Sequence, residues 1–292
     1  MKTITTTTLM VLAIALFSSC ESKSKSSAQT EKKETAKVKP NVKLYVLDGG
    51  SILVNKLEVF SQDTTYSGQT KQLIDPYYVI AHPKGNLIWD AGLPESFVGQ
   101  KPYINPNGAF TSSRKDSLKN QLASIGFKIS DFKYIALSHA HLDHVGHANN
   151  FKNATWLVQE NEYNFITNDS AKVKSADIYN LIKELTNIKK LNGDFDVFDD
   201  GTVIIKTMPG HTIGHQTLYV EAGLDRPILL TGDLYHFEEN RERKGVPSFN
   251  YDVEQTLKSM MSFETFAKEN NAEIIIQHSQ KDYDRLQNLL KE

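Results

Sequence analysis

The chain of 292 residues has a single cysteine, Cys20, and lacks several features that define whole classes of protein. One cysteine cannot form an intrachain disulfide. No run approaches the ~20 consecutive apolar residues of a membrane-spanning helix. Charge is nearly balanced, with 33 basic and 35 acidic residues, so there is no basic footprint for nucleic acid. A G-x-S-x-G nucleophile elbow and a Walker loop are also missing. What remains is an ordinary globular composition, 39% hydrophobic and 23% charged.

The first 20 residues have the pattern of a secretion signal. Lys2 precedes an apolar run, LMVLAIALF at positions 9–17, that is too short to span a bilayer. Small residues follow, and then Cys20, an order that resembles a bacterial lipobox in which the cysteine becomes lipidated after cleavage. A plain signal peptide with an incidental cysteine is the alternative. We therefore expect an exported protein, periplasmic or at the cell surface, that contacts the membrane only through a lipid anchor on Cys20.

A polar segment separates this signal from the rest of the chain. Residues 21–41 contain neither leucine nor aromatic residues and carry six lysines and three glutamates. Such a composition buries too little apolar surface to offset chain entropy, so it predicts a flexible tether. Residues 42–292 are then predicted to form one domain.

Strand-like and helical patterns are mixed along this domain. Runs rich in β-branched and aromatic residues predict strands at 43–54, 77–81, 86–89, 134–137, 156–159, 202–207, 217–220, 228–230 and 274–277. Apolar residues at helical spacing predict helices at 113–125, 176–190, 253–270 and 281–290. The mixture indicates an α/β architecture, with helices packed outside sheets. Residues 97–110, with aromatic residues among Gly and Pro, form either a flap or an ordinary packed loop.

Four of the nine histidines cluster in the string SHAHLDHVGH at positions 138–147. His139 and His141 are two residues apart on an extended segment, so they point to the same side and can hold one cation. Asp143 and His144 follow at the turn into a helix, where they can face a second cation. Imidazole and carboxylate are ligands that zinc favours. A chance H-x-H-x-D-H match is expected in roughly one of two thousand shuffled sequences, so the cluster predicts a metal site.

Three further polar residues each follow an apolar strand. They are His211 in PGHTIGH after strand 202–207, Asp233 after strand 228–230, and His278 after strand 274–277. Each alone is equally well explained as a loop or capping residue. Together they place metal ligands at one edge of the predicted sheets, where active sites of layered α/β proteins lie.

These seven residues resemble the ligand pattern of the metallo-β-lactamase superfamily, whose fold has four layers, αββα. The resemblance implies one zinc site made of His139, His141 and His211. It implies a second site made of Asp143, His144 and His278, with Asp233 bridging the two. The string WDAG at positions 89–92 resembles an element of the superfamily whose aspartate, Asp90 here, supports the metal site from behind.

Within that superfamily the chain is similar to the N-acyl homoserine lactonases over nearly all of residues 43–290. The similarity includes LIWDAGLPES at 87–96, PGHTIGHQTL at 209–218 and PSF at 247–249. One departure is that His236 stands where these lactonases often have a tyrosine, while Tyr235 lies one position earlier; another is Leu142 in place of a frequent phenylalanine. Either His236 or Tyr235 is expected to stabilise the developing oxyanion. For His236 an exposed loop position is the alternative.

The resemblance implies a dinuclear-metal hydrolase that opens the lactone ring of N-acyl homoserine lactones by attack of a metal-bridging hydroxide. The catalytic groups would be Asp143 and Asp233, with His236 or Tyr235. Two alternatives stay open. The same metals can act on another lactone, a β-lactam, a thioester or a phosphotriester, or the chain can be a non-catalytic metal-binding lipoprotein.

Overall fold

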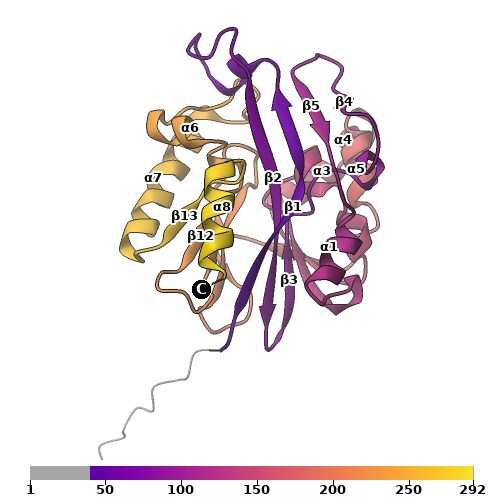
Figure 1. Cartoon of the computed structure of the whole chain (residues 1–292), viewed down its shortest axis with the longest axis vertical. Coiled ribbons are helices and arrows are strands. Elements are labelled where there is room, and N and C mark those ends of the chain that lie inside the picture. The colour runs from indigo at the N-terminus through magenta and orange to yellow at the C-terminus, as the bar shows by residue number, and fades with distance from the viewer. Residues whose placement is uncertain (1–39, 292) are drawn as a thin grey trace, which may run out of the picture. The chain divides into compact units, whose positions relative to one another are not determined.

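Two mixed β-sheets form the centre of the computed structural model, which describes residues 40–291 (Figure 1). The first sheet has the order β4-β5-β1-β2-β3-β6-β7-β8. Its strands are β1 (Lys43–Val54), β2 (Lys71–His82), β3 (Gly85–Trp89), β4 (Tyr103–Ile104), β5 (Phe110–Ser113), β6 (Phe132–Ala136), β7 (Thr155–Gln159) and β8 (Ile188–Leu191). The second sheet has the order β13-β12-β11-β10-β9. Its strands are β9 (Phe195–Asp196), β10 (Val203–Thr207), β11 (Gln216–Val220), β12 (Ile228–Leu230) and β13 (Glu273–Ile275).

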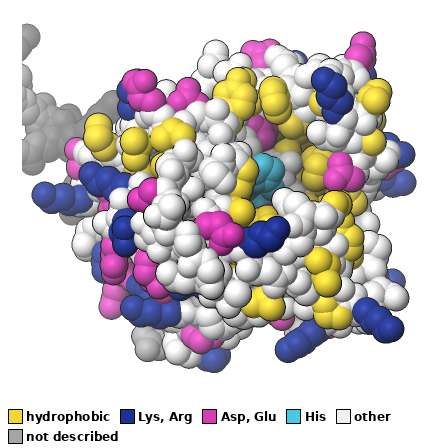
Figure 2. Space-filling view, turned by 90° about the horizontal axis from the view of Figure 1, so that it is seen from above, with side chains coloured by type: hydrophobic (Ala, Val, Ile, Leu, Met, Phe, Trp, Pro, Cys, Tyr) yellow, Lys and Arg dark blue, Asp and Glu magenta, His cyan; other side chains and the backbone are white. Residues whose placement is uncertain are grey.

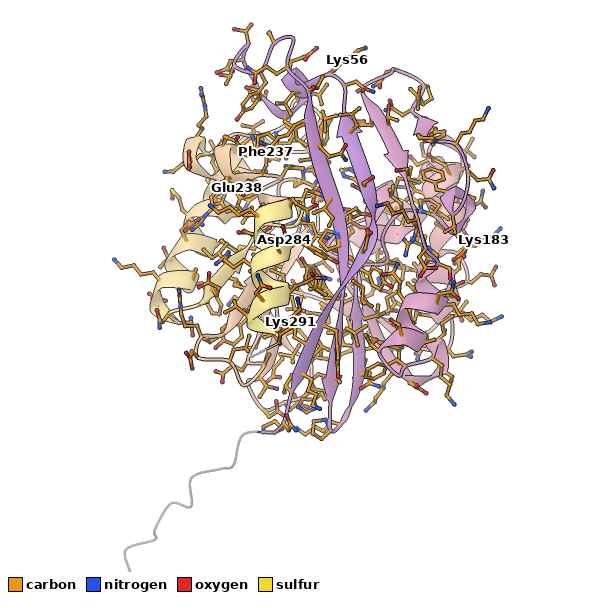
Figure 3. The ribbon with its side chains drawn as sticks, in the orientation of Figure 1. Lys56, Lys183, Phe237, Glu238, Asp284 and Lys291 are labelled. Atoms are coloured by element: carbon orange, nitrogen blue, oxygen red, sulfur yellow. The ribbon has the colours of Figure 1, made fainter. Side chains whose placement is uncertain are left out.

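Helices cover the outer faces of both sheets. On the first sheet lie α1 (Leu118–Ser124), α3 (Glu160–Thr167), α4 (Asp169–Lys174) and α5 (Ala176–Ile182), and Figure 3 shows Lys183, just after α5, at the outer side of this layer. Beside the second sheet lie α6 (Glu238–Arg243), α7 (Val253–Glu269) and α8 (Gln280–Leu289) (Figure 1). The short α2 (Leu142–Val145) follows β6. This is the predicted αββα fold, which is confirmed.

Alternation along β2 shows why the layers form. Tyr78 and Ile80 point into the core between the two sheets, while Tyr77 and Val79 point to the other face and pack with the helices outside it. Side chains alternate between the faces of a strand, so the apolar stretch 77–81 of β2 needs cover on both sides. The second sheet is covered in the same way, because Phe263 of α7 packs with strand residues of that sheet.

Two predicted helices differ from the structure. The predicted helix 176–190 is wrong beyond Ile182, where α5 ends, because residues 188–191 form β8, which pairs in parallel with β7. Leu191 enters the core between the sheets, and this burial outweighs the helical spacing of the apolar residues. The predicted helix 113–125 begins only at Leu118, where the Ser117 side chain accepts the Asn120 N–H.

The segment 97–110 contains β4, which pairs with β5 as an antiparallel hairpin. Among residues 40–291 no helix is long and apolar enough to cross a membrane. The predicted signal at 1–20 and nearly all of the predicted tether at 21–41 lie outside the described residues, so they stay predictions.

Candidate metal centre

The histidine-rich string 138–147 begins where β6 ends. His141 is extended (φ −94°, ψ 163°) and occupies the N-cap position of α2, so the chain turns directly from the strand edge into a helix. His139 and His141 therefore lie on the extended part, and Asp143 and His144 lie in the first turn of α2. The sequence spacing places two pairs of ligands on two neighbouring sides of one loop.

One group of possible ligands consists of His139, His141, His211 and Asp233, whose ligand atoms all lie within 4.8 Å of one another. Nδ1 of His141 is 2.9 Å from Nε2 of His139 and 3.1 Å from Nε2 of His211. Three buried or half-buried imidazoles thus direct a ring nitrogen at a common point. This donor set fits a divalent metal ion such as zinc.

The second group consists of Asp143, His144 and His278. Asp233 lies between the groups, because its Oδ1 is 3.3 Å from Nε2 of His144 and 3.0 Å from Nε2 of His278. Its Oδ2 faces the first group, at 3.5 Å from Nε2 of His139 and 3.4 Å from Nε2 of His211. One carboxylate therefore has an oxygen directed at each group, as a bridging ligand requires.

The far nitrogen of most of these histidines is held by an oxygen. Nδ1 of His278 lies 2.8 Å from the Ile74 carbonyl oxygen, and Nδ1 of His211 lies 3.2 Å from Oδ1 of Asn250. A ring N–H fixed in this way leaves the lone pair of the other nitrogen pointing at the metal position. Asn250 also donates to the Gly210 carbonyl at 2.9 Å, and no sequence pattern singles it out as part of the site.

Asp90 supports His144 from behind. Its Oδ2 is 3.1 Å from Nδ1 of His144, and its Oδ1 accepts the Ser138 N–H at 2.6 Å. Asp90 has a left-handed backbone (φ 59°), which an L-residue adopts only at a cost. The contact that the resemblance implied for this aspartate is present in the structure.

The pKa shifts of the histidines differ between the two groups of ligands. Burial lowers the pKa of His139 and of His211 well below the ordinary value, so both rings are neutral, as metal ligands must be. Burial also acts against charge on His278, but the Asp233 carboxylate beside it raises the pKa of His278 to about 9. Burial alone would raise the pKa of Asp233, yet the surrounding histidines hold it well below its usual range. The second group thus attracts positive charge, which a divalent cation supplies.

His215 orients the bridging aspartate. Its Nδ1 lies 3.0 Å from the Met208 carbonyl, and its Nε2 accepts the Asp233 backbone N–H at 2.9 Å. Burial lowers the pKa of His215 to about 4, so this acceptor nitrogen stays unprotonated near neutral pH. His215 is therefore part of the support of the site, although it lies in neither ligand group.

Four of the seven candidate ligands line a cavity of about 280 Å³. Asp143, Asp233, His141, His236 and His278 contribute its polar floor. Its walls are mostly apolar and come from distant parts of the chain: Ile52, Phe60, Leu73, Leu93, Tyr103, Phe110, Leu142 and Phe249. Figure 2, which looks down on the end of the molecule that is uppermost in Figure 1, shows histidine in a hollow with hydrophobic side chains around it. The β4–β5 hairpin contributes to one wall, so residues 97–110 include part of the cavity lining.

His236 is buried at this floor, and the expectation of an exposed loop histidine is wrong. Its Nε2 is 3.2 Å from Oδ2 of Asp233, and its ring packs edge-on against Phe60 with centroids 4.7 Å apart. This approach to Asp233 lacks hydrogen-bond geometry, and within residues 40–291 neither ring nitrogen of His236 has a hydrogen-bond partner. A buried donor without a partner, facing a cavity, is able to bind a ligand oxygen there.

Tyr235 points the other way, and its predicted contact with the substrate is wrong. The side chain lies in the cluster between the second sheet and α7, where its ring packs edge-on against Phe263 at 5.9 Å. Burial raises the pKa of the Tyr235 hydroxyl above its usual range, and Glu264 lies beside that hydroxyl. Consecutive residues of an extended segment face opposite sides, so Tyr235 and His236 cannot both face the cavity.

The geometry defines a site for two metal ions on an αββα fold, and the comparisons with known proteins agree. Residues 73–278 match the family described as the metallo-beta-lactamase superfamily. This match spans more than half of the chain, so the chain belongs to the metallo-β-lactamase superfamily.

More specific relatives are lactonases. An N-acyl homoserine lactonase from a Bacillus species is 32% identical over 225 residues, covering 75% of this chain and 85% of the relative. The N-acyl homoserine lactonase AttM of Rhizobium radiobacter is 28% identical over 253 residues, covering 82% and 93%. A solved N-acyl homoserine lactone hydrolase with N-hexanoyl-L-homoserine at its catalytic metal centre has a TM-score of 0.71 and 28% identity, covering 84% and 96%. Within the superfamily, the chain belongs to the N-acyl homoserine lactonase family.

Proposed function

We propose that this protein hydrolyses the lactone ring of N-acyl homoserine lactones. Water adds across the ring ester, the C–O bond to the ring oxygen breaks, and the products are an N-acyl homoserine carboxylate and a proton. The observation that carries the proposal is the pair of ligand groups sharing Asp233 at the floor of an apolar cavity. The activity in the names of the relatives supports the same substrate.

Zinc is the metal we propose for both positions, because the donors are imidazole and carboxylate. Bound there, two such ions would polarise an ester carbonyl and would lower the pKa of a nearby water to about 7. His139, His141 and His211 would hold one ion, and Asp143, His144 and His278 the other, with Asp233 shared. His139 and His211 are buried and neutral, as these roles need, and at the second position a divalent ion would take the place of the positive charge that Asp233 draws to His278.

Other side chains at the cavity act on the substrate directly. His236 is placed to donate a ring N–H to the carbonyl oxygen, where negative charge develops during attack. Asp143 and Asp233 face the same space, so their carboxylates are the groups placed to pass a proton toward the leaving alkoxide. The apolar walls take the acyl chain and keep bulk water from the reacting ester.

The test is hydrolysis by purified protein with a measured metal content. Proton release at constant pH is followed with short- and long-chain acyl homoserine lactones, with nitrocefin and paraoxon in parallel. We expect two bound ions and lactone opening with kcat/KM of at least about 10⁴ M⁻¹s⁻¹, lost on chelation and restored by zinc. Two bound ions without lactone turnover would contradict the substrate, and cleavage of nitrocefin or paraoxon would identify the alternative.

We also propose that the chain is exported and lipidated on Cys20. The apolar run at 9–17 and the small residues before the cysteine support this. Replacement Cys20→Ser is expected to move the protein from the membrane fraction to the soluble exported fraction of a bacterial host. An unchanged distribution would favour a plain signal peptide.

A further inference from the structure

Glu162, in the first turn of α3, is a buried carboxylate that lies outside both ligand groups. Its side chain is only 3% exposed, and no Lys, Arg or His in the described part of the chain forms an ion pair with it. Buried carboxylates are costly and are usually paired with a cation or hydrogen-bonded on every side. The hydrogen bonds that compensate the burial of Glu162 therefore indicate its role.

Both of its oxygens accept backbone N–H groups from the loops that carry metal ligands. Oε1 accepts the N–H of Ala140 at 3.0 Å, and Ala140 is the residue between His139 and His141. Oε2 accepts the N–H of Gly214 at 2.9 Å, in the loop that begins with His211. One carboxylate thus connects the two loops that supply all three histidines of the first group.

The backbone of the loop at Gly214 packs directly against the first turn of α3. A Cβ atom built on Gly214 would lie 2.5 Å from Cβ of Glu162 and 2.7 Å from its backbone nitrogen. Only glycine fits there, and it brings the Gly214 N–H within reach of the carboxylate. On the other side, the Gln216 N–H donates to the Ser138 carbonyl at 2.9 Å, so the two loops are joined at both ends.

We propose that Glu162 is a positioning residue for the metal centre, whose carboxylate fixes the spacing between the His139–His141 loop and the His211 loop. This proposal rests on the two-metal site of the proposed function. Metal sites need their ligands held within about 0.5 Å of the working geometry, and charge-assisted hydrogen bonds to the backbone supply such a hold. No hydrogen bond of Glu162 reaches the loop of Asp143 and His144 or that of His278, so the effect falls on the first group.

The test compares Glu162→Gln with Glu160→Gln, its matched control. Glu160 is exposed in the same turn, and its carboxylate lies 3.7 Å from Nζ of Lys190, away from the ligand loops. Glutamine has one acceptor oxygen, so its amide group places a donor against one of the two backbone N–H groups. Each purified protein is stripped of metal and titrated with Co²⁺, whose visible absorption reports coordination, and metal content is measured after dialysis.

We expect Glu162→Gln to lower the affinity for one of the two Co²⁺ ions by about 10- to 100-fold. Glu160→Gln should bind both ions with the affinity of the wild type. Glu162→Asp keeps two acceptor oxygens but is one methylene shorter, and it should show a smaller loss in the same direction. Glu162→Asp also provides the test if the Glu162→Gln variant does not fold. Equal Co²⁺ affinities and spectra in all the folded variants would overturn the proposal.

Thermal unfolding of the metal-free proteins separates positioning from plain stabilisation. A Glu162→Gln variant that unfolds at lower temperature but binds both ions with unchanged affinity has lost only a structural contact, and that outcome also overturns the proposal. Wild-type protein that holds two ions without opening a lactone would contradict the proposed substrate alone. The Co²⁺ affinities would then still decide the role of Glu162.

Discussion

At the scale of single residues, the candidate metal centre contains two kinds of buried histidine. Some are oriented to bind a metal ion, and one, His236, is free to bind a substrate. The ring nitrogens of His211 and His278 that face away from the centre are each held by an oxygen, which sets their orientation. His236 is as deeply buried, but in the described residues its nitrogens have no hydrogen-bond partner. Aromatic packing against Phe60 holds the ring in place instead. A polar group kept unsatisfied at the edge of a cavity is expected where a substrate supplies the missing partner.

His236→Phe should therefore lower kcat for lactone opening by about 100-fold, because it removes one donor to the developing oxyanion. The metal content should stay at two ions, since His236 belongs to neither ligand group. His82→Phe is the matched control: His82 is a buried histidine at the end of β2, stacked on Phe198 with centroids 3.9 Å apart, and it does not line the cavity. Steady-state kinetics with metal analysis checks both variants. An unchanged kcat in His236→Phe would remove it from the mechanism.

At the scale of elements, the ligands stand on loops that follow strands, and backbone contacts hold the loops together. The loop after β3 pairs with α2, because the Ala91 N–H donates to the His144 carbonyl and the Gly146 N–H donates to the Gly92 carbonyl, both at 2.9 Å. The contact is tight at Gly146, where a Cβ would lie 2.3 Å from the Gly92 carbonyl oxygen and 2.4 Å from the Pro94 nitrogen. Neither neighbour is a flexible side chain that can move aside.

Gly146→Ala should therefore destabilise the metal-free protein by about 1–3 kcal/mol or more, through backbone overlap. Gly126→Ala is the control, because a Cβ there meets nothing within 4 Å and the positive φ of 83° is the only cost, about 1 kcal/mol. Denaturant unfolding measures both free energies. If both variants lose the same free energy of unfolding, the backbone at the contact between α2 and the loop after β3 can shift at little cost, which contradicts the prediction.

At the scale of the whole molecule, the ligands come from both halves of the αββα sandwich. His139, His141 and His144 follow β6 of the first sheet, whereas His211, Asp233 and His278 follow strands of the second. Each proposed ion would be held by ligands from both sheets, so metal binding would tie the two sheets together at one end. A ligand that binds only the folded chain stabilises it by mass action.

Removal of the metal should lower the melting temperature. With free metal at about 1,000 times its Kd, binding contributes about 4 kcal/mol, which corresponds to roughly 8–16 °C for a domain of this size. Scanning calorimetry before and after treatment with a chelator, and after restoring zinc, is the measurement. If chelation leaves the melting temperature unchanged while metal content falls to zero, the ions do not hold the sheets together.

Local sequence determined much of this protein. A run rich in β-branched and aromatic residues predicted β1 at its observed limits, and helical spacing predicted 253–270 and 281–290 within a residue of α7 and α8. Strong periodicity succeeds because each such segment buries the same face that its pattern marks. The seven candidate ligands could also be predicted from the sequence. They are His and Asp residues, which zinc favours as ligands, and they follow apolar strands. The structure gathers all seven into two adjoining groups.

Only the tertiary structure decided the rest. Strand β8 forms within and just beyond the predicted helix 176–190 because β7 offers a pairing edge and the sheet core takes Leu191, and neither is local to that segment. Tyr235 and His236 are neighbours in sequence, and the packing of α7 against the second sheet determines which one faces the cavity. Glu162 looks like any helix glutamate until two distant loops present their N–H groups to it. Roles of this kind depend on partners far away along the chain, and the folded molecule alone brings those partners together.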